Sequence, residues 1–148
     1  MTMPRWIVLA LVGTLTGIAA AGESGDDLKA MQGRWVVTIT EVDGKPASKE
    51  LMKLKMLLVV EKDRFRVLTD DEVLSGGTLK LDSGKKPRAL DAMLTEGPVK
   101  GVVQKAIYEI KGDTMTAVFA KPGAPRPTEF KTKEGTEQTL VRYERLKK

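Results

Sequence analysis

Cysteine and histidine are both absent from this chain of 148 residues. Without cysteine, no disulfide can form and no lipid can be attached at a cysteine. Without imidazole or thiolate groups, the chain lacks the commonest catalytic nucleophiles and general bases, and the usual ligands of zinc and copper. We therefore expect a protein that is not an enzyme and that has no catalytic residues, no metal and no cofactor.

Strong charge and phosphate-binding motifs are also missing. The net charge is only +5, and the basic pairs are scattered along the chain. No glycine-rich loop follows a strand and opens a helix, as phosphate binding requires. The acidic run 70–72 lacks the alternating oxygen ligands and the glycine of a calcium loop. We expect no nucleic-acid partner.

The first residues have the pattern of an export signal. Arg5 precedes an apolar stretch that ends at Ala19-Ala20-Ala21, a small-residue cleavage site. The stretch is too short and too rich in alanine and glycine for a comfortable membrane span. We expect a periplasmic or extracellular protein with no integral membrane span after cleavage, divided into a signal peptide (1–21), a leader with a short helix (22–32) and a barrel domain (33–148). A retained N-terminal anchor helix is the alternative.

Short apolar segments separated by turn signals follow the leader. In the first, Trp35, Val37 and Ile39 alternate with polar residues, so we expect all three on one buried face. Asp43-Gly44 is a strong turn signal, and 46–54 is typical of a short helix with Ser48 as its cap. About eight strands follow one another with hairpin-length links, which is the number at which a small barrel closes. The sequence predicts an all-β antiparallel barrel with one or two short helices.

Two segments are expected to lie outside the regular strands. Ser75-Gly76-Gly77 should interrupt a strand, with Leu79 continuing it. The segment 121–127 holds three prolines, which exclude it from a central strand. A polyproline recognition segment is one interpretation. We favour a stiff connection that covers one end of the barrel. Two roles stay open for Arg126 and Glu129, which are to orient a ligand or to pair with each other.

Gly33-x-Trp35 after a short helix, together with Arg145 near the C-terminus, is similar to the lipocalin signature. The resemblance implies that Gly33, Trp35 and Arg145 close the bottom of a lipocalin-like barrel, with the arginine packed across the tryptophan ring. A cation over a tryptophan face is the strongest of the cation–π pairs.

Longer blocks resemble a lipocalin-like domain family found mainly in Planctomycetes. The blocks are Leu28-x-x-Met31-Gln32-Gly33-x-Trp35, Val42-Asp43-Gly44-Lys45, Lys85-Lys86-Pro87-x-x-Leu90-Asp91, Thr95-Glu96-Gly97-Pro98, Ile107-Tyr108-x-Ile110-x-Gly112-Asp113-Thr114 and Arg126-Pro127-Thr128-Glu129-Phe130. The family is usually exported and has no established activity. The chain departs from it at Arg142 and at Ala92, where a larger apolar residue is usual and alanine would leave extra room in the barrel.

Two function classes remain open. One is an exported binding module that holds a small apolar or amphipathic ligand in the barrel, with a candidate lining of Phe65, Leu90, Tyr108, Met115, Phe119 and Tyr143. The alternative is a filled-barrel structural or interaction module of the cell envelope, with an envelope protein bound through its loops. An enzyme using a Glu96–Glu129 carboxylate couple is a distant third. An interior cavity would favour the first class, and a packed core the second.

Overall fold

The computed structural model describes residues 25–147 except 71 and 99. The predicted signal peptide and the start of the predicted leader therefore lie outside the described residues. The described part begins with a short helix at 25–31, which runs directly into the first strand.

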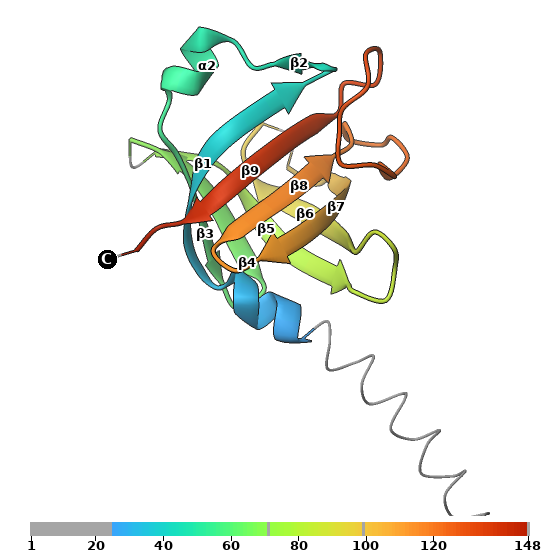
Figure 1. Cartoon of the computed structure of the whole chain (residues 1–148). Helices are drawn as coiled ribbons and strands as arrows, with labels where there is room; N and C mark the ends of the chain where they lie inside the picture. Colours follow the sequence, from blue (N-terminus) through green and yellow to red (C-terminus); the bar gives the residue numbers. More distant parts are fainter. Residues whose placement is uncertain (1–24, 71, 99, 148) are drawn as a thin grey trace, which may run out of the picture.

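Eight strands of the described chain form a closed antiparallel barrel (Figure 1). Each pairs with the next along the chain, and the last pairs back with the first. The barrel strands are β1 (Gly33–Val42), β3 (Met56–Glu61), β4 (Arg64–Thr69), β5 (Glu72–Asp82), β6 (Ala89–Glu96), β7 (Val103–Lys111), β8 (Thr114–Phe119) and β9 (Thr139–Arg145). This confirms the predicted all-β, lipocalin-like barrel.

The link between β1 and β3 carries a two-residue strand and a short helix. Asp43 and Gly44 have φ values of 53° and 81°, and they turn β1 back onto β2 (Lys45–Pro46). Two successive positive φ values are what a tight hairpin of this hand requires. Helix α2 (Lys49–Lys53) follows, and the Ser48 side chain accepts a hydrogen bond from the Leu51 backbone N–H, as expected of its cap.

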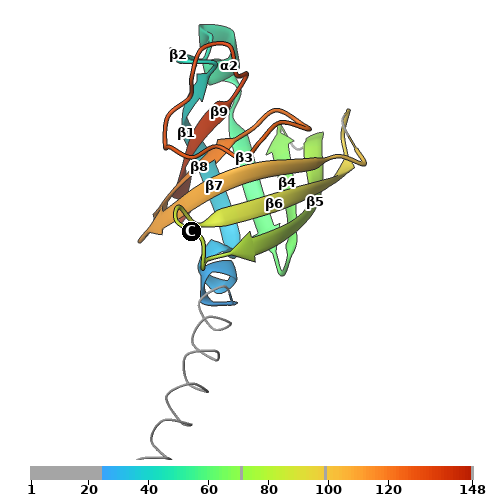
Figure 2. The same cartoon turned by 90° about the vertical axis from the view of Figure 1, so that its right-hand side faces the viewer.

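The two ends of the barrel are different. The helix at 25–31 lies against one end, whereas α2 and β2 lie at the opposite end (Figures 1 and 2). We call the first the closed end, because Met31 and Trp35 are fully buried there. We call the second the open end.

Inward and outward side chains alternate along the strands and form two separate apolar clusters. The larger fills part of the barrel interior and includes Trp35, Tyr108 and Tyr143. The smaller consists of Ile107, Val118 and Leu140 on the outer face of β7–β9, covered by Phe130.

A β-bulge in β1 overturns one sequence expectation. The pairing of β1 with β9 shifts register between Val37 and Ile39, so one extra residue is accommodated there. Ile39, predicted to point inward, is 44% exposed, whereas Thr40 is only 6% exposed. The bulge therefore turns an apolar side chain outward and a hydroxyl inward.

The glycines of β5 do not interrupt the strand. β5 runs through them from Glu72 to Asp82. A Cβ built on Gly77 would lie 1.8 Å from the carbonyl oxygen of Met93 on β6, so only glycine permits this close approach. The predicted break of the strand is wrong, although the pairing of β5 with β6 does shift register between Gly76 and Gly77.

The proline-rich connection crosses the outer face of the barrel, not its end. Its Arg126 donates hydrogen bonds to the carbonyls of Leu90 (2.8 Å) and Ala106 (2.9 Å), and pairs with the Asp91 carboxylate at 2.7 Å. Thr132 accepts a hydrogen bond from the Gly44 N–H at 2.7 Å. Of the two roles left open for Arg126 and Glu129, pairing with each other is wrong, since Glu129 faces lysines.

Candidate ligand cavity

A cavity of about 380 Å³ occupies the barrel interior. Its walls come from all eight barrel strands, with Met31 toward the closed end and Leu51 of α2 toward the open end. Small-molecule pockets in proteins span roughly 300–1,000 Å³ and are mostly apolar. The size and composition of this cavity fall in that class.

Five of the six residues predicted from the sequence lie on its wall. Phe65, Leu90, Met115, Phe119 and Tyr143 line the cavity. Tyr108 is buried in the interior cluster but is absent from the lining, because its ring lies toward the closed end and its hydroxyl contacts the N-terminal helix. Ala92, where the sequence suggested extra room, is also a lining residue.

Thr40 is a lining residue that sequence reasoning missed. Its hydroxyl is fully buried, and it makes no hydrogen bond to any described residue. A buried hydroxyl without a partner carries an appreciable free-energy cost. One sequence signal was available, because the apolar residues of β1 switch from odd to even positions. Trp35 and Val37 are odd-numbered, whereas Val42, which also lines the cavity, is even-numbered.

The Tyr143 hydroxyl is in a similar situation. The residue is 6% exposed and lines the cavity, and within the described chain it has no hydrogen-bond partner. Burial alone raises the pKa of this phenol above its ordinary value, with no charged neighbour contributing. A buried tyrosine usually finds a partner for its hydroxyl, so the absence of one here is unusual.

The remaining chemistry of the wall is neutral. No Asp, Glu, Lys or Arg occurs among the described residues that line the cavity. Besides the two hydroxyl residues above, Ser75, Gln104 and Thr139 line it, and all three are only half-buried. The Gln104 amide N–H donates to the Ala120 carbonyl at 3.0 Å. The cavity is thus apolar, with a few uncharged hydrogen-bonding groups.

Apolar side chains also border the open end. Leu51 of α2 lines the cavity, and its neighbours Met52 and Leu54 are 43% and 45% exposed. Val42, at the end of β1, is 36% exposed and also lines the cavity. Apolar side chains thus surround the open end of the cavity.

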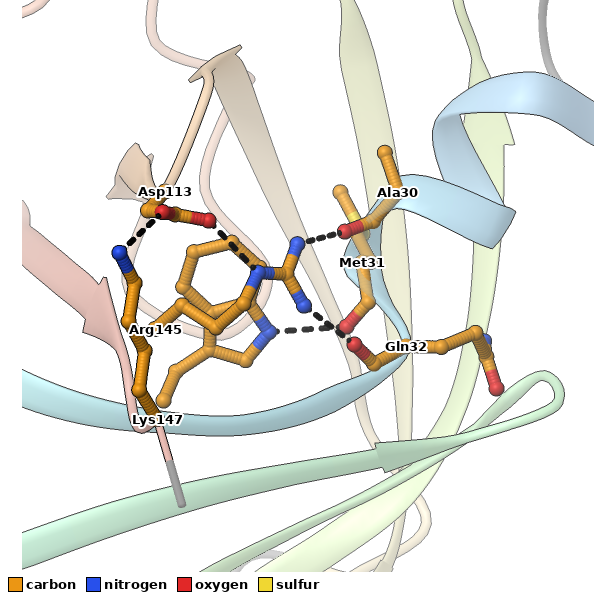
Figure 3. Close-up of polar contacts among 7 residues, drawn as sticks. Ala30, Met31, Gln32, Asp113, Arg145 and Lys147 are labelled. Carbon is orange, nitrogen blue, oxygen red and sulfur yellow. Dashed lines mark hydrogen bonds and ion pairs between the residues drawn. The ribbon is translucent and has the colours of Figure 1, made fainter.

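The closed end is sealed by Trp35 and Arg145. The guanidinium carbon of Arg145 lies 4.3 Å from the centroid of the Trp35 ring, whose N–H donates to the Met31 carbonyl at 2.8 Å. Arg145 also donates to the carbonyls of Gln32 (2.7 Å) and Ala30 (2.5 Å), as Figure 3 shows. These contacts hold the helix at 25–31 across the barrel end.

Gly33 and Asp113 complete this arrangement. Gly33 has a φ of 111°, and a Cβ there would lie 3.4 Å from a guanidinium nitrogen of Arg145. The Asp113 carboxylate accepts from Arg145 at 3.1 Å and pairs with Lys147 at 3.0 Å (Figure 3). Lys147 and then Arg145 hold the pKa of this carboxyl below its ordinary value.

Asp27 fastens the other side of the N-terminal helix. Its carboxylate accepts a hydrogen bond from the Tyr108 hydroxyl at 2.7 Å and pairs with Arg88 at 3.1 Å. Burial, followed by the bond to Asp27, raises the pKa of the Tyr108 phenol. The contact between Asp27 and Tyr108 joins residues 81 positions apart, so it left no local signal in the sequence.

Other candidate chemistry is dispersed over the surface. A larger outer groove of about 720 Å³ borders β3 and β4, but its rim mixes arginines with Glu61, Asp63 and Glu96. Glu96 pairs with Arg66 at 3.3 Å, and Glu129 faces Lys131 and Lys133. The structure therefore engages the two carboxylates of the hypothetical couple with separate cations. No group of three or more acidic residues within the described ranges is arranged to hold a metal ion.

Comparisons with protein-family models, curated proteins and solved structures found no match. Among the described residues, no helix has the length and apolar character needed to cross a membrane.

Proposed function

We propose that the protein is a binding module that holds one small apolar or amphipathic molecule inside its barrel. The observation that carries this proposal is the cavity of about 380 Å³, lined by apolar side chains from every barrel strand. Eight-stranded barrels have interiors either filled by side chains or wide enough for one small ligand. A lined cavity favours the second case over the filled-barrel scaffold.

The size of the cavity bounds the guest. Taking ~30 Å³ per non-hydrogen atom, as in liquid water, the cavity holds about a dozen such atoms. A longer chain would extend through the open end, past Leu51 and Val42. The proposed ligand class is therefore a single chain or one ring system, not a multi-chain lipid.

The proposal includes no catalysis and an exported location. The chain has no histidine and no cysteine, and the described carboxylates near β6 and the proline-rich connection are each paired with cations. Export, to the periplasm or beyond the cell, depends on the signal pattern of residues 1–21 and on the resemblance to the exported planctomycete family. Both stay predictions, which N-terminal sequencing of the protein from its host would check.

Ligand binding is tested by mass spectrometry and thermal unfolding. Native mass spectrometry of the protein from its own host should show a co-purifying small molecule. A bound ligand should raise the melting temperature in step with the logarithm of its concentration. Ala92→Leu, which fills part of the cavity, is the matched control and should abolish the rise.

The opposite results would favour the scaffold. If no small molecule co-purifies and no fatty alcohol, isoprenoid or envelope glycan raises the melting temperature, the binding proposal is wrong. An envelope protein captured through the loops would then be the expected partner.

A further inference from the structure

The two unpartnered hydroxyls in the cavity lie on one side of it. Thr40 is on β1 and Tyr143 on β9, and these strands pair directly. Tyr143 is opposite Val37, and Thr40 is opposite Val141, so the two residues are diagonal neighbours on the inner face. Such neighbours are within reach of a long side chain such as tyrosine.

The bulge in β1 places the Thr40 hydroxyl in the cavity, and we call Thr40 and Tyr143 together the polar strip. Without the extra residue, Ile39 would continue the inward series of Trp35 and Val37, and the strip would hold one hydroxyl instead of two. The bulge is held by a hydrogen bond from the Thr38 hydroxyl to the Arg142 carbonyl at 3.2 Å. Bulges commonly re-aim a side chain at a functional position.

The chemistry of the wall restricts what these hydroxyls can bind. Each hydroxyl can both donate and accept, so it can match an alcohol, a carbonyl, an ester or an amide. An ionised carboxylate or ammonium group would need an opposite charge to offset its desolvation. No described lining residue supplies one.

We propose that the cavity selects molecules with an uncharged hydrogen-bonding group, which binds Thr40 and Tyr143 while the apolar remainder lies against the opposite wall. This inference rests on the proposed binding function and adds the class of ligand. The opposite wall includes Phe65, Leu90 and Leu94, which offer only apolar contact. A carboxylate of equal chain length binds more weakly because of its charge, not because of its shape.

The test compares ligands of one size by titration calorimetry near neutral pH. Octanol, octanoate and octylammonium share a chain but differ in the charge of the head group, and ethylbenzene is a soluble ligand without a head group. Octanol should bind at least about ten-fold more tightly than either ion, which corresponds to ~1.4 kcal/mol. Ethylbenzene should bind, but more weakly than octanol.

Two variants locate the head group. Thr40→Val and Tyr143→Phe each remove one hydroxyl and should weaken octanol binding about three- to ten-fold, while ethylbenzene binds as well as before or better. Neither should lower the melting temperature of the free protein, since neither hydroxyl makes a hydrogen bond to a described residue. Removing a hydroxyl with a purely structural role would instead lower the melting temperature and leave octanol binding unchanged.

Thr116→Val is the matched control. Thr116 is 5% exposed but lies on β8 between the lining residues Met115 and Ala117, so it faces away from the cavity. It should leave octanol binding unchanged. If octanoate binds as tightly as octanol, or if Thr40→Val and Tyr143→Phe behave like this control, the head-group inference is wrong while the binding function stands. If none of the ligands binds, both are wrong.

Discussion

The closed end and the open half of the barrel both contain residues of β1 and β9, but among the described residues the polar side chains that these two strands direct toward the interior are hydrogen-bonded only at the closed end. At the closed end, β1 and β9 place Trp35 opposite Arg145, and both side chains donate to backbone carbonyls of the N-terminal segment. Toward the open end, the same strands place Thr40 and Tyr143 inward with no partner among the described residues. The Trp35 and Arg145 side chains are thus hydrogen-bonded at the closed end, whereas the Thr40 and Tyr143 hydroxyls make no hydrogen bond to a described residue.

This difference indicates that one part of the β1–β9 pair stabilises the fold and that another part does not. Satisfied polar groups and dense packing stabilise a fold, whereas unsatisfied groups in a cavity cost stability and are retained where they serve a ligand. On β9 the boundary between the two regimes lies between Arg145 and Tyr143, and on β1 it lies between Trp35 and Thr40, where the bulge occurs. Substitutions on either side of it should therefore have different consequences.

Trp35→Ala should have the largest effect. The side chain is fully buried and its N–H bonds the Met31 carbonyl. Loss of a large aromatic core residue typically costs about 3–5 kcal/mol of unfolding free energy, measured by urea denaturation. Met93→Ala, at a position 43% exposed, is the control and should change stability little. A loss below ~1 kcal/mol for Trp35→Ala would mean that the closed end does not hold the barrel together.

Arg145→Met should come next, with a loss of about 2–3 kcal/mol. The substitution keeps an apolar stem over Trp35, but it removes the charge and leaves the carbonyls of Gln32 and Ala30 without their donor. Arg142→Met is the matched control, because Arg142 is exposed on the outer face of the same strand. Equal effects of the two substitutions would contradict the importance of the closed-end contacts.

The barrel itself could be predicted because its information is local. Alternation along each strand and turn signals such as Asp43-Gly44 specify strands, hairpins and their order. Alternation also assigned Leu90, Met115 and Tyr143 to the inner face, where they line the cavity. It could not assign depth, and so Tyr108 was grouped with them although it lies toward the closed end.

The errors arose where contacts between distant segments override local pattern. The bulge depends on the register of β1 against β9, two strands separated by nearly the whole domain. Gly77 resembles a breaker until Met93 of the neighbouring strand is placed beside it. The position of the proline-rich connection depends on the carbonyls that Arg126 reaches. None of these partners is visible in a short window of sequence.

Replacing either of two buried alanines by leucine should change the unfolding free energy by a smaller amount, and the sign of the change distinguishes the cavity from the packed region. Ala92 and Ala106 are both buried on the inner face, but Ala92 lines the cavity and Ala106 does not. Ala106→Leu should overpack a filled region and lower the unfolding free energy by about 1–3 kcal/mol. Ala92→Leu should fill empty space and raise it by about 0.5–2 kcal/mol.

Urea denaturation of both variants measures these changes. Opposite signs would support a packed region and a cavity within one barrel. If Ala92→Leu destabilises the protein as much as Ala106→Leu, the interior is tightly packed throughout, and the comparison between the two halves fails.

The two buried tyrosines give the smallest effect, since they differ only in what their hydroxyls bind. Tyr108 donates to Asp27 at 2.7 Å, whereas Tyr143 has no partner among the described residues. Tyr108→Phe should therefore cost about 1 kcal/mol of unfolding free energy at neutral pH, and Tyr143→Phe should cost nothing measurable.

Burial raises the pKa of both phenols in the folded protein. The free energy of unfolding is therefore unaffected by their ionisation below the ordinary pKa of about 10 and falls as the pH rises above it, because the unfolded chain releases those protons first. Urea denaturation from neutral pH to pH ~11 should show this decline, and each phenylalanine variant should make it shallower. A decline that neither variant changes would mean that neither phenol is buried as the structure has it.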